Sequence, residues 1–388
     1  MRPTASRTMA QAYLDNSATT RPCSAAVEAM TQCLNEGYFN PSSVYKPAVE
    51  AFRFLREARE NLLDAVHGEG CEVTFTSGGT EANNLAVLGA VGRMRGRQVV
   101  AVSAVEHPSV RAAFDALKEQ GHDVRVIGVT GTGELRWDEL EAALNDGASL
   151  VSCMQVNNET GALLDAERLH RVVNGRALIH VDGVQGFLRV PFDMKWADMY
   201  TLSGHKIHGP KGIGALIVKK GVRLKPQHIG GGQESGLRSG TENTPGIAGL
   251  NAAVLEMRAM GPEMPAMLMA KKLRLVEAIK RAVPEALVNG PEPEVAAPHI
   301  VNIGFPDVRG EVMLHALEGE GVYVSTGSAC SSKKLKVSSV LVSMGIKPSV
   351  AEWAVRFSLS PHTTEEEIDY AAAKIGTLYD QLRRFKRR

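Results

Sequence analysis

The chain has 388 residues, of which 44% are hydrophobic and 22% are charged. This length exceeds one ordinary core and favours two packed domains of roughly 100–200 residues each. The 44 Lys and Arg residues nearly balance the 43 Asp and Glu residues, so the formal net charge is +1. Composition therefore gives no sign of a polyanionic partner, and we expect no direct contact with nucleic acid.

The sequence lacks the usual signals for membranes and secretion. No stretch approaches the ~18–20 apolar residues of a membrane span, and residues 1–12 have no apolar core of the kind found in signal peptides. We therefore expect a cytoplasmic protein. The five cysteines are scattered and form no C-x-x-C pair, which predicts neither disulfides nor a metal site; they are Cys23, Cys33, Cys71, Cys153 and Cys330.

Strand and helix patterns alternate through the first two thirds of the chain. Short β-rich runs occur at 73–76, 98–103, 123–129, 149–156, 177–182 and 198–203. Apolar residues at helical spacing occur between them, over 81–91, 109–120 and 137–143. This alternation predicts an α/β fold with a mostly parallel sheet between helices.

The last third has a different organisation. Residues 247–282 are predicted to be helical with a break near Gly261 and Pro262, and this stretch could join two domains. Mixed strand and helix patterns follow, ending in a charged terminal helix, and predict a small α+β domain. We place the large domain at 14–260 and the small one at 261–388, joined by part of segment 1–25. Segment 291–298, PEPEVAAP, is expected to be an exposed connection.

A turn at residues 76–81 is the first candidate site. Its sequence Thr-Ser-Gly-Gly-Thr-Glu follows a predicted strand and opens a predicted helix. Backbone N–H groups and the positive end of the helix dipole meet at such a point, so it can bind phosphate. Taken alone, the segment is more typical of an ordinary strand-to-helix turn.

Two further strand ends carry candidate residues. Lys206 follows the run at 198–203 and could form a Schiff base with a carbonyl cofactor, although a lone lysine is usually a solvated surface cation. Asp182 ends the run at 177–182, at the edge where α/β proteins bind ligands. Its carboxylate could pair with a pyridinium nitrogen or simply cap a helix.

In order and spacing, these segments resemble the cofactor site of fold-type I pyridoxal 5'-phosphate enzymes, and the chain as a whole is most similar to the cysteine desulfurases of the class V aminotransferase type. The resemblance covers nearly the whole chain and rests on LDNSATT at 14–20, NPSS at 40–43, FTSGGTEANN at 75–84, EHPSV at 106–110, VNNETG at 156–161, HVDGVQ at 180–185, SGHKIHGPKGIGAL at 203–216, GGGQESGLRSGTEN at 230–243, STGSACSS at 325–332 and VRFSLSPHTTEEEID at 355–369.

The resemblance implies a seven-stranded sheet in the large domain and a role for each matched cofactor residue. Lys206 would hold the cofactor and shuttle the substrate α-proton, and His107 would stack on the pyridine ring and assist proton transfer. Asp182 would pair with the ring nitrogen, and Gln185 would contact the phenolic oxygen. The phosphate ligands would be Gly79, Thr80, Ser203 and His205, together with Thr241 from the other subunit of a homodimer.

The resemblance also assigns the substrate and the sulfur acceptor. Arg356 would bind the carboxylate of L-cysteine with help from Asn158, whereas the sequence alone would make Arg356 a structural ion-pair residue. Cys330 would receive sulfur as a persulfide. The loop around Cys330 resembles that of the subfamily with a long catalytic-cysteine loop. The nearby Lys333, Lys334 and Lys336 could lower the pKa of the Cys330 thiol. Without the resemblance, composition favours an inert cysteine in a surface loop, because reactive cysteines are the minority.

The implied function is a cysteine desulfurase that converts L-cysteine to L-alanine and passes sulfur to an iron–sulfur scaffold or a tRNA-thiolating enzyme. Alternatives are a selenocysteine lyase, another lyase or aminotransferase on this fold, and a non-catalytic relative that only docks partners. One departure from the family pattern occurs after Asp182, where Gly183 and Val184 replace the usual Ala and Thr. We expect this change to alter a helix start or a supporting contact without loss of the cofactor.

Overall fold

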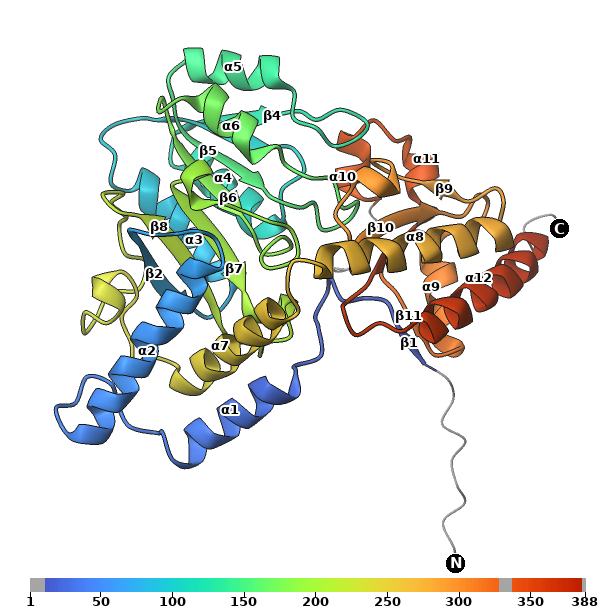
Figure 1. The fold of residues 1–388 in the computed structure, drawn as a ribbon. Helices are drawn as coiled ribbons and strands as arrows, with labels where there is room; N and C mark the ends of the chain where they lie inside the picture. Colours follow the sequence, from blue (N-terminus) through green and yellow to red (C-terminus); the bar gives the residue numbers. More distant parts are fainter. Residues whose placement is uncertain (1–10, 328–336, 386–388) are drawn as a thin grey trace, which may run out of the picture. The chain divides into compact units, whose positions relative to one another are not determined.

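The computed structural model describes residues 11–327 and 337–385, and their contacts divide the chain into two compact units (Figure 1). The large unit comprises Thr19–Asn158 and Ala162–Glu263. The small unit comprises Met1–Ala18, Glu159–Gly161 and Met264–Arg388. The domain boundaries derived from the sequence, 14–260 and 261–388, stay a prediction.

The large unit is built on a seven-stranded sheet, as expected. Its strands are β2 (Cys71–Thr76), β3 (Val99–Ser103), β4 (Asp123–Ile127), β5 (Ala148–Met154), β6 (Leu178–Asp182), β7 (Met199–Ser203) and β8 (Gly214–Lys219). Their order is β2-β8-β7-β6-β5-β3-β4, and only β8 runs antiparallel to its neighbours. Each run predicted as a strand forms one. Strand β8 was missed, because its single apolar run lies inside a glycine-rich stretch.

Helices cover this sheet, and their bounds match the predicted helices to within three residues where one was predicted. They are α1 (Ser24–Asn35), α2 (Lys46–Asp64), α3 (Gly79–Val91), α4 (Pro108–Glu119), α5 (Trp137–Asn145), α6 (Ala166–Val173) and α7 (Thr244–Ala259), with short 3-10 turns η1 (Met194–Trp196), η2 (Gly204–Lys206) and η3 (Glu234–Gly236). Helices α3 and α4 share an apolar core with the sheet that includes Leu85, Phe114 and Leu150. Each such side chain contributes about 1.5–3 kcal/mol of burial free energy.

The strand register brings three sequence-distant segments to one edge of the sheet. Asp182 at the end of β6 pairs with Thr201 of β7, and Ser203 at the end of β7 pairs with Gly214 of β8. Gly214 in turn pairs with Thr76 at the end of β2. The carboxyl ends of β2, β6 and β7 therefore lie side by side, which is where α/β sheets bind ligands.

The small unit is the mixed α+β structure that the sequence predicts. Its strands are β1 (Ala12–Tyr13), β9 (Leu287–Val288), β10 (Ile300–Gly304), β11 (Val322–Tyr323) and β12 (Ala354–Ser358), arranged as a sheet β12-β10-β9 and a pair β1-β11. Its helices are α8 (Met264–Ala282), α9 (Gly310–Gly319), α10 (Ser339–Ser343), α11 (Pro348–Ala351) and α12 (Glu365–Phe385), with η4 (Pro293–Val295). Helix α12 packs against α8 and α9 (Figure 1).

The expectation that segment 291–298 is exposed was wrong. Only Glu292, Glu294 and Val295 of this segment are exposed. The cause is Lys272 of α8, which is fully buried and donates from Nζ to the carbonyl oxygen of Ala297 at 2.8 Å. A buried ammonium requires such acceptors, so the segment is held against the helix.

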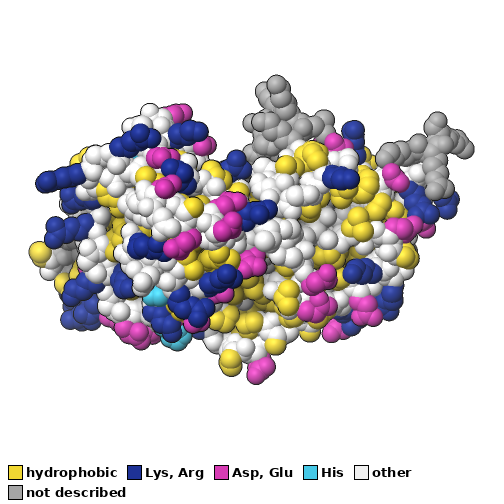
Figure 2. All heavy atoms as spheres, turned by 90° about the horizontal axis from the view of Figure 1, so that it is seen from above, with side chains coloured by type: hydrophobic (Ala, Val, Ile, Leu, Met, Phe, Trp, Pro, Cys, Tyr) yellow, Lys and Arg dark blue, Asp and Glu magenta, His cyan; other side chains and the backbone are white. Residues whose placement is uncertain are grey.

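Two surveys cover only the described residues. Within 11–327 and 337–385, no helix is long and apolar enough to cross a membrane. The same part of the chain contains no group of three or more His, Cys, Asp or Glu side chains that could hold a metal ion. On the face drawn in Figure 2, basic and acidic side chains are interspersed rather than separated.

Candidate active site

The start of α3 forms a compact turn with backbone groups available to an anion. Its N-cap, Gly78, has no side chain with which to bond the first-turn N–H groups. A Cβ on Gly79 would lie 2.6 Å from Val184 Cγ2 and 3.6 Å from Ser203 Cβ, and one on Gly214 would lie 2.7 Å from the Gly78 Cα. Only glycine permits this close approach, which places Ser203 beside the helix start. The predicted phosphate ligands Gly79, Thr80 and Ser203 thus share one location.

The glycine-rich segment 230–243 is tied to the same helix start. Arg238 Nε donates to Glu81 Oε1 at 3.0 Å, and Glu81 Oε2 accepts from the Ser77 N–H at 2.9 Å. Burial opposes ionisation of Glu81, but the hydrogen bonds from Arg238 and Ser77 lower its pKa. Thr241 is exposed near the end of this segment. Its contact with the phosphate in a partner subunit stays a prediction.

Lys206 ends the 3-10 turn η2, directly after β7, and is half-buried. The N-terminal residue Thr20 fixes this turn: its Oγ1 donates to the His205 carbonyl oxygen at 3.0 Å and accepts from the His208 N–H at 2.7 Å. Burial, followed by the charges of Lys206 and Lys211, lowers the pKa of His205 to about 4. His205 is therefore neutral near pH 7 and can meet a phosphate only as a neutral donor.

A buried hydrogen-bond chain connects Asp182 to His107. Asn83 Nδ2 on α3 donates to Asp182 Oδ2 at 2.8 Å and to Ser109 Oγ at 2.9 Å. Ser109 Oγ lies 2.8 Å from His107 Nδ1, and the Ser109 N–H also donates to that nitrogen at 3.2 Å. Because Nδ1 accepts from this N–H, neutral His107 carries its proton on Nε2. The chain fixes both the position and the tautomer of the imidazole.

The charges of Asp182, His107 and Lys206 act on one another. Burial raises the pKa of Asp182, whereas the Val184 N–H and then the charges of His107 and Lys206 oppose that shift. Burial also lowers the pKa of His107. The Asp182 charge opposes this shift, and the Lys206 charge adds to it. Both hydrogen-bond donors to the carboxylate, Asn83 and Val184 N–H, are neutral.

This arrangement fits pyridoxal phosphate. A protonated ring nitrogen would supply the cation that the neutral donors to Asp182 lack. Lys206 would provide the amine, and the start of α3 would provide N–H groups for the phosphate. Gln185, which is 5% exposed, follows Asp182 in the same turn.

The departure at 183–184 has a structural explanation. A Cβ on Gly183 would lie 1.9 Å from Tyr200 Cζ, so the ring of buried Tyr200 occupies the space that alanine would need. The Tyr200 hydroxyl donates to Gln155 Oε1 at 2.6 Å. Val184 packs against Gly79, so its side chain contacts the helix start rather than bonding to it. Asp182 keeps its bond from the Val184 N–H at 3.0 Å.

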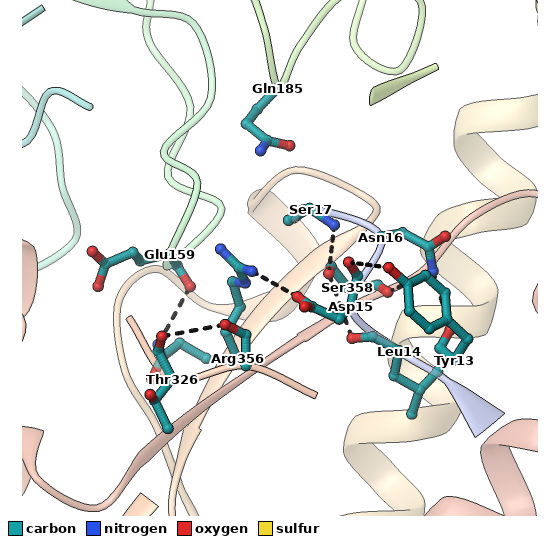
Figure 3. Close-up of polar contacts among 12 residues, drawn as sticks. Tyr13, Leu14, Asp15, Asn16, Ser17, Glu159, Gln185, Thr326, Arg356 and Ser358 are labelled. Carbon is teal, nitrogen blue, oxygen red and sulfur yellow. Dashed lines mark hydrogen bonds and ion pairs between the residues drawn. The ribbon is translucent and has the colours of Figure 1, made fainter. Parts of the chain in front are cut away.

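Arg356 lies in the small unit, at the middle of β12, and forms an ion pair (Figure 3). Its Nη2 donates to Asp15 Oδ1 at 2.7 Å, and its side chain is 8% exposed. Its charge also acts on Glu159, whose pKa burial raises to about 7. Asn158, the other predicted substrate ligand, is the half-buried residue directly before Glu159 and belongs to the large unit.

Cys330 lies outside the described residues. The remaining four cysteines are free thiols: Cys23 and Cys153 are buried, and Cys33 and Cys71 are half-buried. Burial raises the pKa of Cys23, Cys71 and, most strongly, Cys153. These three thiols are poor nucleophiles near neutral pH, since the thiolate is the reactive form.

Sequence reasoning missed three buried polar residues around the site: Asn83, Glu106 and Arg189. Glu106 Oε1 accepts from Ser103 Oγ at 2.8 Å and from the Met154 N–H at 2.7 Å, which ties the end of β3 to the end of β5. Burial, followed by the charge of Asp182, raises the pKa of Glu106 to about 8. Asn83 and Glu106 lie inside matched motifs, and that was the available signal. Arg189 lies outside every motif.

Comparisons with known proteins give matches over nearly the whole chain. The family model for class-V aminotransferases matches residues 12–371. A cysteine desulfurase of Trichormus azollae is 40% identical over 97% of this chain and 94% of its own length. The cysteine desulfurase NifS of Azotobacter vinelandii is 38% identical over the same shares. A solved NifS-like protein superposes with a TM-score of 0.89 at 33% identity, covering 96% of this chain and all of the other.

Proposed function

Because the chain belongs to the cysteine desulfurase family of the class-V aminotransferases, we propose that it removes sulfur from L-cysteine by the site residues named above. Pyridoxal 5'-phosphate is the cofactor of this family. When bound, it withdraws electrons from the substrate α-carbon and so makes the α-proton acidic. The observation that supports the assignment of residues is the hydrogen-bond chain from buried Asp182 through Asn83 and Ser109 to half-buried His107 in the large unit.

The large-unit residues bind and polarise the cofactor. Lys206 attaches it and carries the α-proton on Nζ. Asp182 keeps the ring nitrogen protonated, since a fixed negative charge favours the protonated form. His107, held by Ser109 with its proton on Nε2, stacks on the ring. Neutral His205 donates to the phosphate without adding charge.

Substrate binding is assigned to Arg356 and Asn158. The Arg356 guanidinium is shaped for a carboxylate and already binds that of Asp15 at 2.7 Å. Cys330 is the proposed sulfur acceptor: its thiol takes the sulfur as the carbon–sulfur bond of L-cysteine breaks, leaving L-alanine and a Cys330 persulfide. The raised thiol pKa values of Cys23, Cys71 and Cys153 support Cys330 over those three.

Several partners follow from this reaction. The persulfide requires an acceptor protein, and the similarity to the cysteine desulfurase NifS supports an acceptor in iron–sulfur cluster assembly. The location of Thr241 in an exposed segment suits a phosphate contact in a second subunit, and hence a homodimer. We place the reaction in the cytoplasm.

The test is an absorbance spectrum of the purified protein supplied with cofactor, before and after L-cysteine, with L-alanine and sulfide measured in the same sample. The Cys330→Ala variant is the comparison. A yellow protein that forms L-alanine only when Cys330 is present supports the proposal. A yellow protein indifferent to that substitution contradicts the role of Cys330, and a colourless one contradicts the cofactor site.

A further inference from the structure

Arg189 is a buried cation in the turn that follows β6. Arg189 is 2% exposed. Its Nη2 donates to Gln185 Oε1 at 3.1 Å and to the Val184 carbonyl oxygen at 3.3 Å. Both acceptors are neutral, and Nε and Nη1 have no hydrogen-bond partner in the described part of the chain. Burial lowers the pKa of Arg189 to about 9, so it remains charged at neutral pH. A buried cation without an anionic partner is costly, and a nearby anionic ligand would offset that cost.

The turn around Arg189 is fixed from several sides. Leu188 has φ +59°, a left-handed conformation that costs a branched residue about 1–2 kcal/mol. A Cβ on Gly186 would lie 1.9 Å from Gln155 Oε1, and Gln155 Nε2 donates to the Val190 carbonyl oxygen at 3.2 Å. Strain of this kind persists only where the surroundings impose it, and it is typical of functional sites. The fold therefore holds Arg189 against Gln185.

The contact determines how the Gln185 amide is oriented. A guanidinium has donors and no acceptor, so the Gln185 atom that faces Arg189 must be the oxygen. The NH2 group then points to the other side of the amide plane. We propose that Arg189 is a positioning residue that holds Gln185 with its NH2 group toward the phenolic oxygen of the cofactor. The proposal rests on the role of Gln185 in the proposed function.

The proposed orientation has a measurable electrostatic effect. An N–H donor stabilises the ionised phenolic oxygen and so lowers the pH at which the absorbance of the bound cofactor changes. Without Arg189, the amide can rotate by half a turn and present its oxygen, which repels the ionised form. Removal of Arg189 should therefore raise the pH midpoint of this absorbance change.

The experiment is a pH titration of the cofactor absorbance in the loaded protein. Arg189→Met is expected to raise the midpoint by about one pH unit. Gln185→Leu should raise it as well, and the double variant should match Gln185→Leu, because Arg189 acts through Gln185. The same substitution at Arg176, which is exposed and paired with Glu141 at 2.9 Å, is the matched control and should leave the midpoint unchanged.

Two outcomes would overturn the proposal: an unchanged midpoint in Arg189→Met, or shifts that add in the double variant. Melting of the cofactor-free protein checks folding. Arg189→Met should be no less stable than the parent, since it replaces a buried unpaired cation by an apolar side chain. If it does not fold, Arg189→Ala, which also lacks a donor, replaces it; a rise of the midpoint in the same direction is then expected, and no rise would contradict the proposal. A parent protein that takes up no cofactor would instead contradict the proposed function.

Discussion

The carboxyl edge of the large sheet and the Arg356 region of the small unit differ in the hydrogen-bond partners of their charged side chains. At the sheet edge, neutral donors surround the Asp182 carboxylate and neutral acceptors surround the Arg189 guanidinium. In the small unit, Arg356 is already paired with Asp15 at 2.7 Å. Under the proposed function, the first region would receive a charged ligand, whereas in the second the substrate carboxylate would replace that of Asp15 on Arg356. Five substitutions test this contrast.

The largest effect is expected at Lys206. Lys206→Ala removes the amine proposed to attach the cofactor and carry the α-proton, so L-alanine formation should fall about 10³-fold or more. The measurement is L-alanine released per enzyme, with circular dichroism to show that the fold is intact. An active and folded variant would remove Lys206 from the site.

The next effect is expected at Asp182. Asp182→Asn keeps the shape and one acceptor oxygen but loses the charge that holds the ring nitrogen protonated, so kcat should fall about 10²-fold. Since burial raises the pKa of Asp182, the cofactor-free variant should melt no lower than the parent at neutral pH. A variant that loses stability and activity together would point to a structural role instead.

At Arg356 the effect should fall on substrate binding. Arg356→Lys loses the forked pair of donors, so KM for L-cysteine should rise about 10-fold or more, with a smaller change in kcat. Asp15→Asn is the companion variant. It leaves the nearly buried guanidinium with less compensation and should lower the free energy of unfolding by about 1–3 kcal/mol. An unchanged KM in Arg356→Lys would return Arg356 to a purely structural role.

The smallest effect concerns Glu106 and pH. Its folded pKa of about 8 lies above the ordinary 4.5, so the folded chain binds this proton more tightly than the unfolded chain. The associated stability is complete below about pH 4.5 and is lost as pH rises toward about 8. Glu106→Gln should remove this loss and raise the melting temperature at pH 8 by a few degrees, equivalent to about 1–2 kcal/mol.

Melting curves of parent and Glu106→Gln between pH 5 and about 8.5 provide the check. Glu159, whose pKa burial raises to about 7, should leave a residual slope in the variant. Parallel curves at every pH would show that Glu106 does not contribute the predicted proton.

The sequence by itself determined the strand and helix alternation, the family and the local motifs. Runs such as 99–103 and 178–182 are short and bounded by turn residues, and this length favours strands over helices. Motifs such as HVDGVQ and SGHKIHGP carry their chemistry within a few residues, and this allowed Asp182 and Lys206 to be named.

Only the tertiary structure decided which of these groups share a site and what supports them. Pairing of β2 with β8 and of β8 with β7 places the start of α3 beside Ser203, although 120 or more residues separate them in the chain. The space filled by Tyr200 explains Gly183, and burial explains the shifted pKa of Glu106. Arg189 is the clearest residue that sequence could not have identified. Its proposed role follows from its burial and from the left-handed backbone of Leu188, and neither can be predicted from local sequence.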